Sequence, residues 1–345
     1  MKTQYLIPSL KLSSRIHNFQ TQDEFLYVQI SHENRLLVYE KLEFYKEYEN
    51  KPGSMYNVSG IVASDYANFF ERGEIDSFAR DLGYTYSGHH YKNKHLIVKF
   101  PEIKRSYYDR TNKTITEATG HHTLPGFNLF TDEFIIYSEK NELDKVVYKV
   151  KRDFTTGEEL WRFDIRTVNA ELKIDRWQDP VCLYENLLIF SNHLDLFALD
   201  INTGKLVYHQ PLGGYLHHIS FDSGVIFLEA FRSPNDHKFQ LRDCKTGEII
   251  KEKIYSRELF TKKTNEQPTF TNAVIYKNYY VFAYINYQVC FMNRETMEIE
   301  HLFKMKLTVQ EKSKASLDKI TISNGMLHAR SYNFNFWVFD LEGIV

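Results

Sequence analysis

The stretch from Asn186 to Leu212, NLLIFSNHLDLFALDINTGKLVYHQPL, holds the clearest copy of a unit that recurs along the chain. It contains a short apolar run, a polar turn, a second apolar run that ends at Asp200, a Thr203-Gly204 turn and a third apolar run. Short apolar runs flanked by turn residues are typical of β-strands. In the turn, Gly supplies the positive φ angle that a tight connection needs, and the Asp carboxylate can cap the bend before it. The unit therefore predicts strands joined by tight hairpins.

The Asp of this unit recurs at intervals of 43 to 50 residues. Its copies are Asp109, Asp153, Asp200, Asp243, Asn293 and Asp340. The Thr-Gly turn is intact after three of them and becomes Thr296-Met297 after Asn293. A period of this length, with about four short strands per unit, is typical of the blades of a β-propeller. With a weaker unit at residues 25–48, the pattern predicts an all-β fold in which residues 1–345 form a single seven-bladed β-propeller domain, with eight blades as the alternative.

Two further features concern how the propeller is completed. The last unit ends just after its turn and lacks an outermost strand, and residues around Tyr5-Leu6-Ile7 are free to supply it. The N-terminal strand is therefore expected to close the last blade, which removes an exposed sheet edge. Residues 53–83 are in excess of the repeat, and their apolar residues lie close to a helical stripe. We expect a helical insertion there, either as a local cap or as a lid or docking element.

The repeat resembles a known family. Residues 197–205, FALDINTGK, are similar to the repeat of PQQ-like, quinoprotein dehydrogenase-type β-propellers, and Trp161 occupies the Trp position that follows the turn in that family. The resemblance covers roughly residues 95–345 and implies the fold. The enzymes of the family usually have eight Trp-bearing blades and, in many members, adjacent cysteines and a calcium site, whereas this chain has a Trp after only one turn and cysteines at least 46 residues apart. The resemblance therefore implies a non-enzymatic relative with no expected cofactor.

The charge balance narrows the choice of partner. A net charge of −2, from 43 basic and 45 acidic residues, supplies no overall field that would attract nucleic acid or anionic lipid. The N-terminus is interrupted by Pro8, Lys11 and Arg15, and no later apolar run approaches the length of a membrane span. We expect a cytoplasmic protein without a nucleic-acid or membrane partner.

Candidate binding residues gather near the expected starts of first strands and in loops between middle strands, which share one face of a propeller. They are His89, His90, His121, His122, Trp177, Asp179, His193, His217, His218 and His237. Imidazoles that converge from several blades can bind a divalent metal or an anionic group, and His122 and His218 are the candidate metal ligands. The alternative is that these side chains stack and hydrogen-bond in an aromatic-rich core. No catalytic residue is assigned, because the common phosphate-binding and nucleophile motifs are absent from the sequence.

Two functions remain open. The first is a non-catalytic module that binds a protein partner through the loop-bearing face, with an immunity protein that neutralises a cognate bacterial toxin as its specific form. The second is a metal-dependent hydrolase or lyase, or a carbohydrate-binding propeller, that uses the His-rich surface. The first function is preferred, because the repeat motif reports the fold and nothing in the motif search supports chemistry.

Overall fold

The computed structural model describes most of the chain. The described residues are 4–12, 16–30, 35–49, 55–58, 61–64, 68–72, 74–82, 84–91, 94–99, 104–117, 127–131, 133–140, 147–154, 156–168, 178–192, 194–233, 236–260, 271–284, 287–307, 317–331 and 335–344. They divide into two compact units, residues 14–164 on one side and residues 1–13 with 165–345 on the other. The expectation of one domain stays a prediction.

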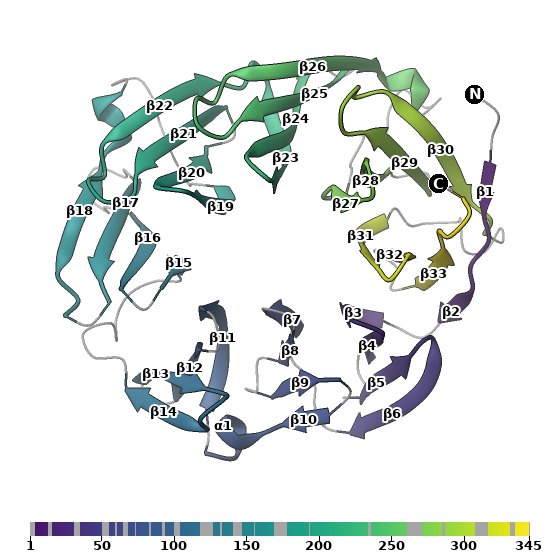
Figure 1. Ribbon diagram of the computed structural model, residues 1–345, viewed down its shortest axis with the longest axis horizontal. Coiled ribbons are helices and arrows are strands. Elements are labelled where there is room, and N and C mark those ends of the chain that lie inside the picture. The colour runs from purple at the N-terminus through teal and green to yellow at the C-terminus, as the bar shows by residue number, and fades with distance from the viewer. Residues whose placement is uncertain are drawn as a thin grey trace. The chain divides into compact units, whose positions relative to one another are not determined.

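Unit 14–164 contains four sheets, each a four-stranded antiparallel meander (Figure 1). The first sheet is β3 (Ile16–Gln22), β4 (Phe25–Ile30), β5 (Arg35–Glu40) and β6 (Glu43–Glu49). The second is β7 (Met55–Val58), β8 (Ile61–Ser64), β9 (Phe69–Glu71) and β10 (Glu74–Asp76), followed by helix α1 (Phe78–Asp81). The third is β11 (Tyr84–Tyr91), β12 (Lys94–Lys99), β13 (Lys104–Asp109) and β14 (Thr114–Glu117). The fourth is β15 (Phe127–Phe130), β16 (Phe134–Lys140), β17 (Val147–Asp153) and β18 (Glu159–Phe163).

The other unit also contains four sheets, and two short 3-10 helices, η1 (Ile165–Thr167) and η2 (Arg257–Leu259). One sheet is β19 (Gln178–Tyr184), β20 (Leu187–Ser191), β21 (Asp195–Asp200) and β22 (Leu206–Pro211). The next is β23 (Tyr215–Asp222), β24 (Val225–Ser233), β25 (Asp236–Asp243) and β26 (Ile249–Ser256). The third is β27 (Val274–Tyr276), β28 (Tyr279–Tyr284), β29 (Gln288–Asn293) and β30 (Ile299–Met305), with β1 (Gln4–Leu6) added at its edge. The last is β31 (Leu317–Ser323), β32 (Met326–Ser331), β33 (Phe336–Asp340) and β2 (Leu10–Leu12).

This succession of four-stranded meanders confirms the all-β propeller class. Eight such sheets occur among the described residues, which corresponds to the alternative with eight blades. In the same residues, no helix is both long and apolar enough to cross a bilayer.

Residues 53–83 supply the additional sheet, and the expected helical insertion needs correction. The segment folds into β7 to β10, and its helix is the single turn α1. The reason lies in Phe69 and Phe70, which are both fully buried. Phe69 packs with Ile97 and Tyr108, whereas Phe70 packs in a separate cluster with Tyr27. A strand with a sheet on each side buries both of its faces, and its continuous apolar run can be mistaken for a helical stripe.

The N-terminus completes the last sheet, but with a different strand from the one expected. β2 pairs antiparallel with β33, with Leu10 opposite Val338 and Leu12 opposite Phe336. The stretch around Tyr5 and Leu6 instead forms β1, which pairs in parallel with β30. Leu6 is completely buried in the core beneath that sheet, and this burial explains why the apolar stretch docks there.

The recurring Asp residues organise the hairpins between third and fourth strands. Oδ1 of Asp200 accepts the backbone N–H of Thr203 at 2.8 Å and the Thr203 hydroxyl at 2.9 Å, and the Gly204 N–H bonds to the Asp200 carbonyl at 2.9 Å. Asp153 and Asp243 accept the equivalent backbone N–H at 2.7 and 2.9 Å. Gly204 has φ of 68°, a conformation that costs little only for Gly. The side chain thus satisfies turn donors that the strand ladder leaves open.

The same turns hold neighbouring sheets together. The Tyr208 hydroxyl of β22 donates to the Cys244 carbonyl at 3.2 Å, and the Gln210 amide donates to the Thr246 carbonyl at 3.3 Å. The Tyr208 ring lies so close to Gly247 that a Cβ atom built there would be 2.6 Å from ring carbon Cε2. The turn of one sheet is therefore a packing surface for the edge strand of the sheet before it.

Replacing Gly247 with Ala tests this packing. Gly247 has φ of 68°, so the variant has backbone strain as well as a collision with Tyr208. We expect Gly247→Ala to lower the free energy of unfolding by about 3 kcal/mol, measured by urea denaturation. Gly343→Ala is the matched control, because Gly343 has φ of 77° but no atom within 4 Å of the built Cβ. Its loss should be only about 1 kcal/mol. Equal losses in both variants would contradict the packing role of the turn.

His328 on β32 predicts a pH dependence of stability. Burial lowers its pKa to about 4, although hydrogen bonds with the backbone of Met326 and Thr321 act in the opposite direction. An unfolded His has a pKa near 6.5, so below that pH the unfolded chain binds more protons and stability falls as the pH drops toward 4. We expect the wild type to lose about 2 kcal/mol more than His328→Gln between pH 7 and pH 5, in parallel urea titrations. Identical pH profiles would contradict this role of His328.

Candidate functional site

Backbone bulges recur in the first strands of the sheets. In each case, the register against the second strand shifts because the first strand contains extra residues. In unit 14–164 the shift falls at His17 in β3, at residues 87–89 in β11 and at Asn128 in β15. In the other unit it falls at residues 179–181 in β19, at His217 in β23 and at Asp318 in β31. Bulges re-aim side chains and are frequent beside functional sites.

Five of these six bulges lie near the start of their strand. We call the end of a sheet where the first strand begins, and where the second strand connects to the third, the loop end. The opposite end, with the Thr-Gly turns, is the turn end. Polar residues therefore occupy bulged positions at the loop end of several sheets. The sequence analysis predicted the candidate binding residues at this same end.

For five candidate residues, the structure describes the backbone position only. Asp179 is the second residue of β19, and His217 and His218 are the third and fourth residues of β23, so all three lie at the loop end as expected. His89 and His90 lie instead near the last residue of β11, toward the hairpin that leads into β12. Their expected position at a strand start is corrected, because β11 begins five residues earlier than His89, at Tyr84. His121, His122, Trp177 and His193 lie outside the described residues.

His237 is the candidate whose side chain is described, and it forms a buried pair with Glu229. Nδ1 of His237 lies 2.9 Å from Oε1 of Glu229, and the two side chains are only 1% and 3% exposed. His237 follows the loop between β24 and β25, so the pair lies at the loop end. The rings of Phe260 and Tyr284 stand edge-on to the imidazole at 5.4 and 6.3 Å. In such apolar surroundings, the carboxylate fixes the orientation of the imidazole ring.

Two more acids of the same unit form close side-chain pairs. In the neighbouring sheet, Nε2 of His209 lies 2.8 Å from Oδ1 of Asp195, the first residue of β21. In the last sheet, Arg330 bonds both carboxylate oxygens of Asp318, at 3.2 and 2.5 Å. Beside that pair, burial and the Arg330 cation lower the pKa of Lys319 to about 8. Each of these three pairs, His237 with Glu229, His209 with Asp195 and Arg330 with Asp318, lies within a single sheet.

Large apolar side chains are exposed at this loop end. Leu194, in the loop between β20 and β21, is 56% exposed, and Tyr215, the first residue of β23, is 49% exposed. The backbone N–H of Leu212 bonds to the Leu194 carbonyl at 2.8 Å, which ties the loop to the segment leading into β23. Leu259 in η2 is 40% exposed where β26 ends. Apolar anchors beside ordered polar pairs are typical of protein-binding surfaces.

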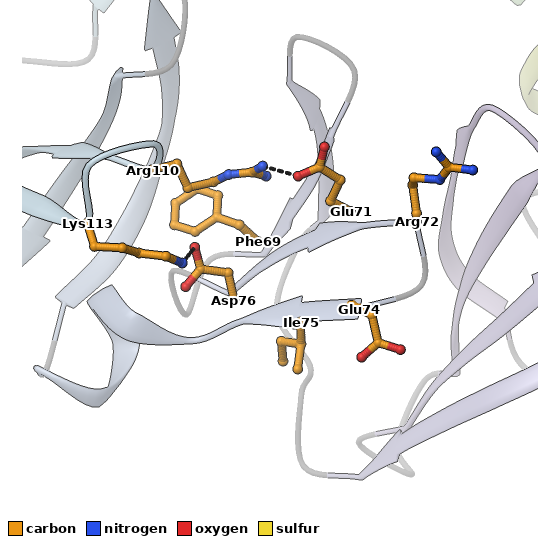
Figure 2. Close-up of a pocket in the computed structure, with 8 residues that line it drawn as sticks. All are labelled: Phe69, Glu71, Arg72, Glu74, Ile75, Asp76, Arg110 and Lys113. Atoms are coloured by element: carbon orange, nitrogen blue, oxygen red, sulfur yellow. Dashed lines mark hydrogen bonds and ion pairs between the residues drawn. The ribbon is translucent and has the colours of Figure 1, made fainter.

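A pocket of about 400 Å³ lies in unit 14–164, between the hairpins β9–β10 and β13–β14 (Figure 2). Its lining residues are Phe69, Glu71, Arg72, Glu74, Ile75, Asp76, Arg110 and Lys113. The acids in it are paired, Glu71 with Arg110, Asp76 with Lys113 at 2.5 Å, and Glu74 with Lys46 at 3.1 Å.

The pairing also sets the ionisation of these acids. Burial raises the pKa of Asp76, but bonds from Lys113, the Phe78 N–H and Tyr108 outweigh it and hold the pKa below its usual value. The hydrogen bond from Lys46 lowers the pKa of Glu74. The pocket therefore lies between two sheets at the turn end, and its acidic and basic side chains balance each other. Its acids form ion pairs that connect neighbouring sheets.

That His122 and His218 bind a metal ion stays a prediction. His122 lies outside the described residues, and His218 is described by its backbone, which pairs with Glu229. Within the described ranges, no group of three His, Cys, Asp or Glu side chains has the spacing to hold a metal ion. Glu229 and His237 would supply two ligands, fewer than the three protein ligands of a catalytic zinc site.

Sequence reasoning missed the acidic partner Glu229 and the bulge at Asp318. Glu229 lies within the apolar run VIFLEAF, where a single acid in a buried strand is itself a signal, because such a charge needs a partner. The bulges have no comparable signal, because they become visible only when two strands are paired.

Comparison with known proteins shows likeness in structure alone. No protein-family model matches the chain, and no curated protein matches its sequence. Among solved structures, the computationally designed Ika8 protein has a TM-score of 0.59 at 13% identity, covering 98% of this chain and 99% of its own. BamB from Moraxella catarrhalis has a TM-score of 0.56 at 13% identity, covering 98% of both chains, and Sqt1 from Saccharomyces cerevisiae has 0.58 at 10% identity, covering 99% of both. At these identities the likeness supports the β-propeller fold and leaves the function to be argued from the site.

Proposed function

We propose that the chain is a non-catalytic interaction module that binds one protein partner through the loop end of its sheets. The observation that supports this most directly is the exposure of Leu194 and Tyr215 on adjoining sheets, beside the buried pairs of Asp195 and Glu229. Aromatic and aliphatic anchors on a rigid polar frame are the features that contribute most of the energy in protein interfaces. A rigid sheet also lets such loops bind without a large ordering cost.

A protein fits this surface better than a small molecule. The bulged positions and exposed anchors are spread over several sheets of the unit formed by residues 1–13 and 165–345, and Asp195, Glu229 and Asp318 are each paired within their own sheet. Small-molecule sites need a concave pocket with a few converging polar groups. An extended array of shallow contacts instead matches the area that a stable protein complex buries.

The finer form of the proposal is an immunity protein that neutralises a cognate bacterial toxin in the cytoplasm. It follows from how compact propeller scaffolds can be used, whereas the resemblance of the repeat to PQQ-like propellers supports the fold alone. No residue of the chain identifies the toxin, so the partner has to come from experiment. The metal-dependent or carbohydrate-binding alternative is tested by the same experiment.

The expected result is partner capture that depends on the loop end. We expect the tagged wild type to retain one protein from a lysate of its source organism in near-equal amount, identified by mass spectrometry. The double variant Leu194→Ala with Tyr215→Ala should reduce that capture at least tenfold, because losing two anchors costs about 2 kcal/mol or more. Calorimetry with the purified partner then gives the same loss as a change in Kd.

Leu183→Ala is the matched control. Leu183 belongs to the same unit and is 42% exposed, but it lies at the end of β19, at the turn end. Its substitution should leave the affinity unchanged. If Leu183→Ala weakens binding as much as the double variant, the loop end is not the binding surface. A sample without any protein partner, but with about one transition metal per chain, would favour the metal-dependent alternative.

A further inference from the structure

Among the described residues, no strand pairs with the outer side of the edge strand β26. It contains eight residues, Ile249–Ser256, and forms the end of its sheet. Ile249, Ile250 and Ile254 are 47%, 55% and 55% exposed. The strand contains no Pro or Gly, and after a bulge at Ile250 its register against β25 continues without a further shift from Lys251 to Ser256. Long, regular, apolar edges of this kind are templates for an added strand.

The charges in β26 do not protect this edge in the usual way, because they are directed to neighbours in their own unit. Lys251 donates to the Glu295 carbonyl, and Lys253 pairs with Glu298. Glu252 accepts from the amide of Gln240 at 2.5 Å and lies 3.5 Å from Nζ of Lys238. Side chains of a strand stand perpendicular to its sheet, so these contacts leave the outer backbone groups accessible.

The adjacent sheet shows that such an edge accepts another strand. β1 pairs with β30 in parallel, with Gln4, Tyr5 and Leu6 opposite Phe303, Lys304 and Met305. Figure 1 shows β1 lying along the outer side of β30, whereas no strand of the described part of the chain lies beyond β26. The other edge strands of this unit are less suitable: β22 ends at Pro211, and β2 has only three residues.

Charge decides between a second copy of the chain and a different partner. Two copies of β26 related by a two-fold axis form an antiparallel pair. In that pair, odd-numbered residues lie opposite odd-numbered residues and even-numbered residues lie opposite even-numbered ones. When Ile250 faces Ile254, Lys251 faces Lys253 and Glu252 faces Glu252. Shifting the register by one step either way places Lys251 opposite Lys251, or Lys253 opposite Lys253. Like charges directly opposite each other are destabilising, so the sequence of β26 opposes pairing with itself.

We propose that β26 binds an extended strand of a partner protein by β-augmentation, and that this strand carries acidic residues opposite Lys251 and Lys253 and apolar residues opposite Ile250 and Ile254. Backbone hydrogen bonds to the edge supply affinity, and the alternation of apolar and acidic side chains supplies specificity. The site lies on a fourth strand, away from Leu194 and Tyr215, so this inference goes beyond the proposed function and does not require it.

The test uses synthetic peptides of about ten residues as the probe. One has the central sequence Val-Glu-Thr-Glu-Val, and the other has Lys in place of both Glu. Since the pattern reads the same in both directions, either strand orientation satisfies it. By fluorescence anisotropy, the wild type should bind the acidic peptide about tenfold more tightly than the basic one, and hydrogen exchange should slow in β26 when the acidic peptide is bound.

The double variant Lys251→Glu with Lys253→Glu should reverse this preference. Lys304→Glu is the matched control, because it makes the same kind of charge change on β30, whose edge β1 already covers. It should leave the preference unchanged. Absence of saturable binding by the wild type, an unchanged preference in the double variant, or protection confined to other strands overturns the proposal. Loss of partner capture through Leu194 and Tyr215 is measured separately, so failure of one proposal is distinguishable from failure of the other.

Discussion

The hydrogen bonds that an Asp or Asn side chain accepts from the turn after it are the constraint on which the rest of this structure depends. In the copies at Asp153, Asp200, Asp243 and Asn293, Oδ1 accepts the backbone N–H three residues ahead. This fixes where the third strand ends and the fourth begins, and so sets the register of each hairpin. The turn also presents its carbonyls to the preceding sheet: the Tyr255 hydroxyl donates to the Met297 carbonyl at 2.7 Å, as Tyr208 does to that of Cys244. One short motif therefore organises both the sheet and its contact with the next.

The two ends of the sheets differ in how freely their side chains can be replaced without disturbing the fold. The turn end is occupied by this repeated motif and by paired charges such as Arg110 with Glu71, and substitutions there disturb packing between sheets. The loop end has bulged strands of different sequence, so its side chains can change without altering the ladder. Hydrogen-bonded pairs such as Glu229 with His237 connect the strands beneath it. A variable surface on a fixed frame is what recognition of a specific partner requires, and this asymmetry is why the proposed function is placed at the loop end.

Edge strands pose a second physical problem, since their outer N–H and C=O groups are open to any extended chain. The chain solves it at β30 by adding its own residues Gln4–Leu6, with Leu6 buried in the core. At β26 it combines apolar exposure with a Lys-Glu-Lys sequence that opposes pairing between copies. The proposed loop-end interaction uses side chains, whereas an added strand at β26 would use the backbone, so a single partner could engage both without competition.

The sequence by itself determined the repeating unit, because the Asp, Thr and Gly of the turn act within a few residues of one another and leave a local pattern. It also indicated that the N-terminus completes the last sheet. Tertiary structure decided the rest. Residues 53–83 form four strands because Phe69 and Phe70 are buried on opposite sides by different sheets, and no local pattern distinguishes that from a short helix. His237 could be singled out as a candidate, but its partner Glu229 and the bulges at His217 and Asp318 depend on which strands lie side by side. Pairing between strands is a long-range property, and only the folded chain reveals it.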